Sequence, residues 1–179
     1  MRKHVLFAAI LLAAFAIAVN AQQASGLYNP SIDMDGFLKV SQDAAKHRST
    51  RRLTEEQFIA ASKEPGAVIL DARSSEKFDE LHIAGAINLS FPDITVESLA
   101  KDLPDKATKI LIYCNNNFEN EPSAFPTKVA PASLNLSTYI SLYTYGYRNV
   151  YELGPLLNAK TTRLKLISSK DEAKRVGVR

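Results

Sequence analysis

The sequence has few residues that could hold a metal or form a cross-link. Its 179 residues include one cysteine, Cys114, three histidines and no tryptophan. A single thiol cannot form an internal disulfide, and the histidines and Cys114 do not have the spacing of a zinc-ligand set. We therefore expect no disulfide framework, no metal site and no cofactor.

The net charge of the chain is also small. The formal net charge is +3, and two of the basic residues, Arg2 and Lys3, belong to the N-terminal stretch, so the remaining chain carries only +1. A nearly neutral chain presents no strong basic field for nucleic acid or for an anionic membrane surface. We expect no nucleic-acid partner.

The first 21 residues have the layout of a secretory signal peptide. A basic start, Met1–His4, precedes an uncharged apolar run, Val5–Val19, and the small residue Ala21. The run is shorter than the ~20 residues of a spanning helix, and no basic cluster follows it at once. We expect cleavage after Ala21, a periplasmic or secreted protein, and no membrane span after cleavage.

The rest of the chain divides into three expected parts. Residues 22–50 are interpreted as a leader with a helical extension, 51–160 as one folded domain, and 161–179 as a C-terminal strand and a charged tail that frays from about Lys170. Within the domain, apolar runs typical of buried strands alternate with helical patterns. This alternation predicts an α/β fold with a central, mostly parallel sheet covered on both faces.

Several element boundaries follow from local signals. Thr54 and Gln57 have the spacing of a capping box, which predicts a helix that ends at Pro65. Ser75 is a plausible cap of the next helix. Strands are expected at 51–53, 67–71, 86–89, 109–113 and 149–153, and helices at 31–47, 74–81 and 95–103. A last helix after Pro131 has apolar residues at helical spacing, which predicts a buried face formed by Leu136, Ile140, Tyr143 and Tyr147.

The strand at 109–113 leads directly into Cys114. A thiol at the carboxyl end of a parallel strand, ahead of a helix, lies in the crevice where open α/β sheets bind ligands. Backbone N–H groups of such a loop favour an anion and would lower the pKa of the thiol. The alternative is a buried, inert cysteine that acts as a small hydrophobic residue.

Four segments, in this order and spacing, resemble the rhodanese-like domain over roughly residues 51–160. They are Val68–Arg73, Phe78 with His82–Leu89, Ile110–Cys114, and Tyr145–Leu153. The resemblance implies a three-layer α/β sandwich around a parallel sheet. It also implies that Cys114 carries sulfur as a persulfide.

The segment after Cys114 departs from the family's compact loop. It contains no glycine and no arginine, and three prolines delay the next helix. Phosphatases and arsenate reductases of related fold need an arginine here to clamp an oxyanion, so we disfavour that activity. Side-chain amides could stabilise an anionic sulfur or replace glycine in left-handed turns, which suggests a neutral or larger sulfur compound. The candidate loop residues are Asn115, Asn116, Asn117, Phe118, Glu119, Asn120 and Lys128, the last being the only cation of the loop.

Three further residues are expected to support the site. Asp71 and Arg73 could line the pocket, although an internal ion pair that fixes the loop is the favoured interpretation. His82 is expected to form structural hydrogen bonds, because no partner for acid–base chemistry is apparent.

The leading hypothesis is a sulfurtransferase that passes sulfane sulfur through Cys114 to a small thiophilic acceptor or a protein thiol. The alternative is a catalytically lapsed rhodanese-like module that uses the long loop to bind a partner.

Overall fold

The computed structural model describes residues 29–176, so the expected signal peptide and the first residues of the part expected at 22–50 lie outside the described residues. The chain separates into two units, Met1–Leu38 and Lys39–Arg179. Helix α2, Met34–Arg48, begins in the first unit and continues into the second. Among the described residues, no helix is long and apolar enough to cross a membrane.

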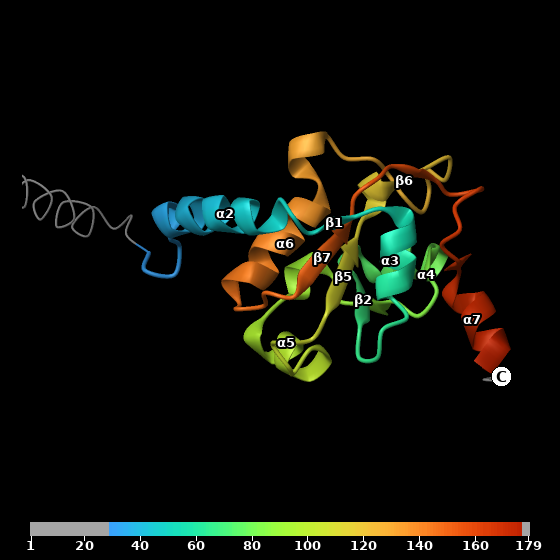
Figure 1. The fold of residues 1–179 in the computed structure, drawn as a ribbon, viewed down its shortest axis with the longest axis horizontal. Coiled ribbons are helices and arrows are strands. Elements are labelled where there is room, and N and C mark those ends of the chain that lie inside the picture. Colours follow the sequence, from blue (N-terminus) through green and yellow to red (C-terminus); the bar gives the residue numbers. More distant parts are fainter. Residues whose placement is uncertain (1–28, 177–179) are drawn as a thin grey trace, which may run out of the picture. The chain divides into compact units, whose positions relative to one another are not determined.

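A five-stranded sheet forms the centre of the second unit (Figure 1). The strand order is β1-β7-β5-β2-β4, and every neighbouring pair is parallel. Strands lie at all five expected positions, as β1 (Arg52–Leu53), β2 (Val68–Asp71), β4 (Ile87–Asn88), β5 (Ile110–Tyr113) and β7 (Val150–Leu153). The prediction of an α/β fold with a parallel sheet is therefore confirmed.

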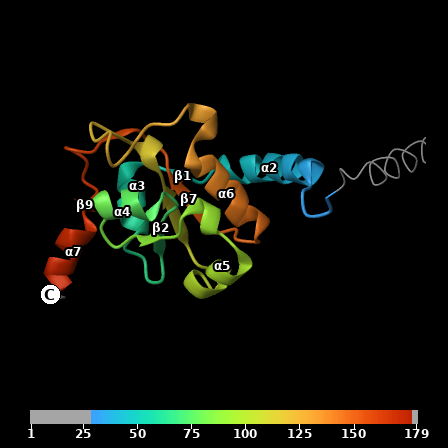
Figure 2. The ribbon, with the colours of Figure 1, turned by 180° about the vertical axis from the view of Figure 1, so that it is seen from behind.

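Helices cover both faces of this sheet, as the two opposite views in Figures 1 and 2 show. Alternate residues of β5 point to opposite sides: Ile110 and Ile112 join one buried cluster and Leu111 the other. The first cluster includes residues of α5 (Val96–Asp102) and α6 (Leu134–Thr144), and the second includes residues of α3 (Glu55–Ala61). The sheet therefore lies between two apolar layers. Because the strands are parallel, their carboxyl ends lie along the same edge of the sheet.

Smaller elements complete the unit. Strand β3 (His82–Ile83) pairs antiparallel with β9 (Leu166–Ile167), and β6 (Phe118–Glu119) pairs parallel with β8 (Leu157–Asn158). Helix α4 spans Ser75–Glu80, and short 3-10 turns lie at Phe91–Asp93, Asn115–Asn117 and Ala130–Ala132.

Three local predictions need correction. The N-cap of α4 is Ser74, whose side chain accepts from the Lys77 N–H, and not Ser75. The buried face predicted for the helix after Pro131 is only partly correct: Tyr147 is 0% exposed, and Ile140 and Tyr143 pack partly buried against the same core. The fully buried residues of α6 itself are Asn135, Thr138, Tyr139 and Leu142. Fraying does not begin at Lys170, since helix α7 spans Ser169–Val176.

The predicted capping box at the start of α3 is present. Thr54 Oγ1 accepts from the Gln57 N–H at 3.2 Å, and the Gln57 side chain accepts from the Thr54 N–H at 2.9 Å. Replacing Thr54 by alanine removes one side of this exchange. We expect the free energy of unfolding to fall by ~1 kcal/mol in a denaturant titration, whereas Thr54→Ser, which keeps the hydroxyl, should lose less than half of that.

Candidate active site

Cys114 lies at the carboxyl end of the central strand β5. All four residues of β5 are buried, and Cys114 caps the 3-10 turn Asn115–Asn117 that follows. The Cys114 side chain is itself 0% exposed. The sequence places the thiol at this edge of the sheet, but it does not predict that the loop covers it completely.

Two hydrogen-bonding groups lie next to the sulfur. The backbone N–H of Asn116 donates to Cys114 Sγ at 3.4 Å, and Ser133 Oγ lies 3.4 Å from the same atom. Ser133 immediately precedes α6, and its hydroxyl does not cap that helix. An amide and a hydroxyl at these positions can both donate to a thiolate or a persulfide anion. Ser133 was not among the residues predicted from the sequence.

The three asparagines after Cys114 hold the loop in place. Asn115 Nδ2 donates to the Pro126 carbonyl, and Asn116 exchanges two hydrogen bonds with the backbone of Lys128. Asn117 Nδ2 donates to the Leu153 carbonyl, and its Oδ1 accepts from the Cys114 N–H and from Asn135 Nδ2. The amide side chains thus bind loop and strand backbone, and it is the main chain of Asn116 that reaches the sulfur.

The rest of the loop is packed against the domain. Phe118 and Phe125 are each 1% exposed, and their ring centroids lie 4.6 Å apart. Glu119 is exposed and belongs to β6, whereas Asn120 takes the left-handed backbone conformation with a φ of 68°. The long segment is therefore an ordered cover anchored by two aromatic rings.

Asp71 and Arg73 form a buried ion pair with three side-chain contacts of 2.6 to 3.0 Å. Arg73 also donates to the carbonyls of Ala124 and Leu81, and its guanidinium lies 4.3 Å from the Phe125 ring centroid. Burial disfavours the charged guanidinium, but the hydrogen bonds and charge of Asp71 outweigh it and raise the pKa of Arg73. Because its N–H groups are used in this way, Arg73 fixes the loop and does not form an oxyanion clamp.

Tyr113 extends this network. Its hydroxyl donates to Asp71 Oδ2 at 2.5 Å and accepts from the Ile83 N–H at 3.1 Å. Burial and the neighbouring Asp71 charge raise the pKa of Tyr113 well above its usual value, so the phenol stays protonated and keeps donating.

His82 has structural contacts. It is buried, stacks on Phe78 with centroids 3.8 Å apart, and places Nδ1 2.7 Å from the Phe78 carbonyl oxygen. Its Nε2 lies 3.3 Å from a Glu172 oxygen. His82 therefore links α4, β3 and α7 and is separate from the residues that contact the sulfur.

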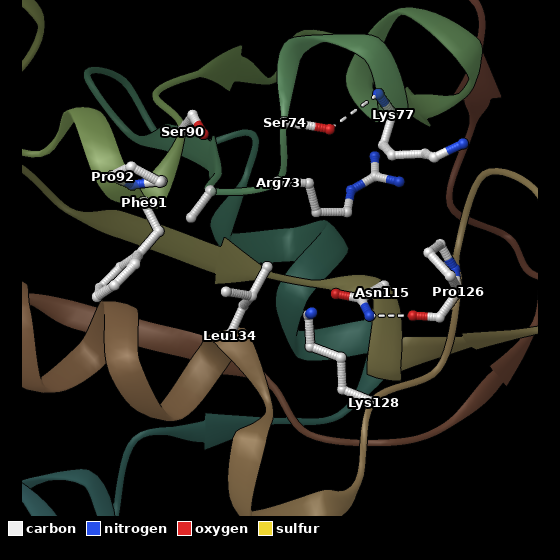
Figure 3. A pocket seen from close by; sticks show the side chains of 11 residues that line it. Arg73, Ser74, Lys77, Ser90, Phe91, Pro92, Asn115, Pro126, Lys128 and Leu134 are labelled. Carbon is white, nitrogen blue, oxygen red and sulfur yellow. Dashed lines mark hydrogen bonds between the residues drawn. The ribbon is translucent and has the colours of Figure 1, made fainter.

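A cavity of about 310 Å³ opens where the segments after β2, β4 and β5 meet (Figure 3). Of the predicted site residues, Arg73, Asn115 and Lys128 line it. The other lining residues could not be predicted from local sequence patterns, because the topology brings them to the cavity. They are Ala72, Ser74, Lys77, Ser90, Phe91, Pro92, Pro126 and Leu134. A second cavity of about 260 Å³ is lined in part by Asn116 and Ser133, the two partners of the sulfur. Asn115 thus lines the first cavity and Asn116 the second, whereas Cys114 itself lines neither.

Within the described residues, no three His, Cys, Asp or Glu side chains gather in a way that could hold a metal ion.

Comparison with known proteins agrees with this architecture. The sequence profile of the rhodanese-like domain matches residues 54–153, and the chain belongs to that family. No curated protein matches the chain.

Solved structures with a similar fold include a rhodanese-like domain from Anabaena, which is 22% identical over 68% of this chain and 81% of its own, with a TM-score of 0.45. A rhodanese with anions from E. coli is 23% identical over 57% and 99%, with a TM-score of 0.40. A thiosulfate sulfurtransferase from Pseudomonas aeruginosa is 20% identical over 72% of this chain and 22% of its own, with a TM-score of 0.49.

Proposed function

We propose that the domain is a sulfurtransferase that carries sulfane sulfur on Cys114. The observation that supports this most is the position of the sulfur: it ends the central strand β5, receives the Asn116 N–H, and lies next to the Ser133 hydroxyl at the start of α6. Hydrogen-bond donors next to Cys114 Sγ stabilise the negative charge of the thiolate. The thiolate is present before Cys114 takes up sulfur and forms again after the sulfur is passed on.

The reaction has two balanced steps. With thiosulfate as donor, the Cys114 thiolate attacks the outer sulfur, the bond from that sulfur to the sulfonate group breaks, and sulfite leaves with the electron pair. A nucleophile such as cyanide then attacks the terminal sulfur of the persulfide. Thiocyanate leaves, and the Cys114 thiolate returns. The signal peptide expected at residues 1–21 would place this reaction in the periplasm or outside the cell.

A second function is favoured by one specific observation. Cys114 is 0% exposed, so no reagent can reach its sulfur unless the covering loop moves. A domain whose loop stays closed would be a binding module, and the surface of the long loop would contact a partner.

Mass spectrometry of the intact protein separates the two functions. After incubation with thiosulfate or an organic persulfide, the wild-type chain should gain one sulfur atom, and cyanide should remove it as thiocyanate. Cys114→Ser should show neither change, because it has no thiol to carry the sulfur. If no donor adds sulfur to the folded wild-type protein, the sulfurtransferase proposal fails and the binding module is favoured.

A further inference from the structure

One wall of the 310 Å³ cavity carries a hydrogen-bond acceptor without a partner. The Nδ2 group of Asn115 donates to the Pro126 carbonyl, so the orientation of the amide is fixed and Oδ1 must face the other way. Figure 3 shows this oxygen directed away from Pro126, toward the space between Leu134 and Lys128. Asn115 is 2% exposed, and its Oδ1 has no hydrogen-bond partner among the described residues. A buried, unpaired acceptor is costly, and a ligand that donates an N–H or O–H would satisfy it.

The same cavity contains one cation whose charge is not neutralised. Arg73 is paired with Asp71, and Lys77 Nζ lies 3.0 Å from Glu80 and 3.7 Å from Glu76. For the Lys128 ammonium group, in contrast, the described part of the chain offers no ion-pair partner. Its backbone is held by two hydrogen bonds to Asn116, which fixes the base of the side chain at the cavity. Lys128 can therefore bind an anionic group of a ligand.

The remaining surface is largely apolar. Phe91, Pro92 and Leu134 line the cavity between these polar groups. Its volume of about 310 Å³ lies at the small end of the range of roughly 300–1,000 Å³ that is usual for ligand pockets. The cavity thus suits a small organic molecule with a carbon skeleton, one anionic group and one hydrogen-bond donor.

We propose that this cavity selects an organic persulfide that carries both a carboxylate and an N–H group, as the persulfide of an amino-acid-type thiol does. The carboxylate pairs with Lys128, and the N–H donates to Asn115 Oδ1. Thiosulfate is a poorer fit, because it has only acceptor oxygens and would turn them toward the lone pairs of that oxygen. The inference rests on the proposed function for the role of the sulfur, although binding in the cavity does not depend on it.

Sulfur transfer from such a donor balances without any further reagent. When the covering loop moves and exposes the sulfur, the Cys114 thiolate attacks the terminal sulfur of the protonated persulfide, and the bond between its two sulfur atoms breaks. The donor leaves as a thiolate, and Cys114 now carries the terminal sulfur with its proton. No net oxidation or reduction occurs, since one S–S bond is exchanged for another.

A matched pair of donors tests the selectivity. The persulfides of N-acetylcysteine and of 3-mercaptopropionate both carry a carboxylate, but only the first has an N–H. We expect kcat/KM for cyanide-dependent thiocyanate release to be about tenfold or more higher for the first, because the second leaves the buried acceptor unpaired. Equal values for the two persulfides would overturn the assignment of Asn115.

A binding measurement separates this inference from the proposed function. The thioethers N-acetyl-S-methylcysteine and 3-(methylthio)propanoate have no sulfur to transfer, and calorimetry with the wild-type protein should show tighter binding of the first. Lys128→Met should weaken that binding about fivefold or more, whereas Lys63→Met, at another exposed lysine away from the cavity, should leave it unchanged. Selective thioether binding without sulfur transfer would uphold the cavity and overturn only the proposed function. Equal binding of the two thioethers, or no effect of Lys128→Met, would overturn the cavity's ligand class.

Discussion

Replacing Asp71 by alanine should lower the free energy of unfolding by about 3–5 kcal/mol. Asp71 is 0% exposed and pairs with Arg73, which is 2% exposed, so the substitution leaves a buried guanidinium without its counter-charge. It also removes the acceptor of the Tyr113 hydroxyl. A titration with urea, followed by circular dichroism, measures the loss as a shift of the unfolding midpoint.

Two further variants identify the cause of this loss. Glu76→Ala removes an acid that is 82% exposed and lies 3.7 Å from Lys77, and it should cost no more than ~1 kcal/mol. Adding Arg73→Met to Asp71→Ala removes the unpaired charge, so the double variant should recover part of the stability. An Asp71→Ala variant as stable as Glu76→Ala would show that Arg73 finds water or another partner when Asp71 is absent.

The fold could be predicted largely because the central strands are buried. Strand β5 consists of four buried residues, and apolar runs of this kind, separated by helical patterns, indicate a parallel sheet. The buried face of α6 could not be predicted in the same way. Asn135 turns inward because its Nδ2 donates to Asn117 Oδ1, a contact across 18 positions that the apolar pattern of the helix does not reveal.

The candidate site was predictable in part: Cys114 could be predicted from the sequence, and so could Arg73, Asn115 and Lys128, which line the cavity. Cys114 follows a strand, so its place at the edge of the sheet follows from the sequence. Its burial depends on the packing of Phe118 and Phe125 against the domain, and no local pattern indicates that packing. Lys77 lies far before Cys114 in the sequence, and Ser133 lies after the third proline of the loop, Pro131. Both residues reach the site through the chain's topology.

The loop that covers Cys114 should control the reactivity of the thiol. Phe125 is 1% exposed, packs on Phe118 and lies under the Arg73 guanidinium, so it is the main apolar anchor of the loop segment 120–133. Truncating a buried phenylalanine to alanine costs about 3–5 kcal/mol. If most of that energy holds the loop closed, Phe125→Ala should make the loop-open state roughly a hundredfold more populated or more.

Alkylation of Cys114 by iodoacetamide in native buffer measures that population. Wild-type protein should react far more slowly than a free cysteine at the same pH, because the sulfur is 0% exposed, and Phe125→Ala should react roughly a hundredfold faster than wild type. The control is Phe58→Ala, which removes an equally buried ring of the same apolar cluster from α3 and leaves the loop's own contacts intact. If Cys114 becomes accessible by local opening of the loop, alkylation should be faster in Phe125→Ala and not in Phe58→Ala. The rate should then depend little on the urea concentration, since local opening exposes little surface. Equal acceleration in both variants would mean that Cys114 becomes accessible only by global unfolding. A thiol with that property could not exchange sulfur with a small donor in the folded protein, and the binding module would then be the better interpretation of the domain.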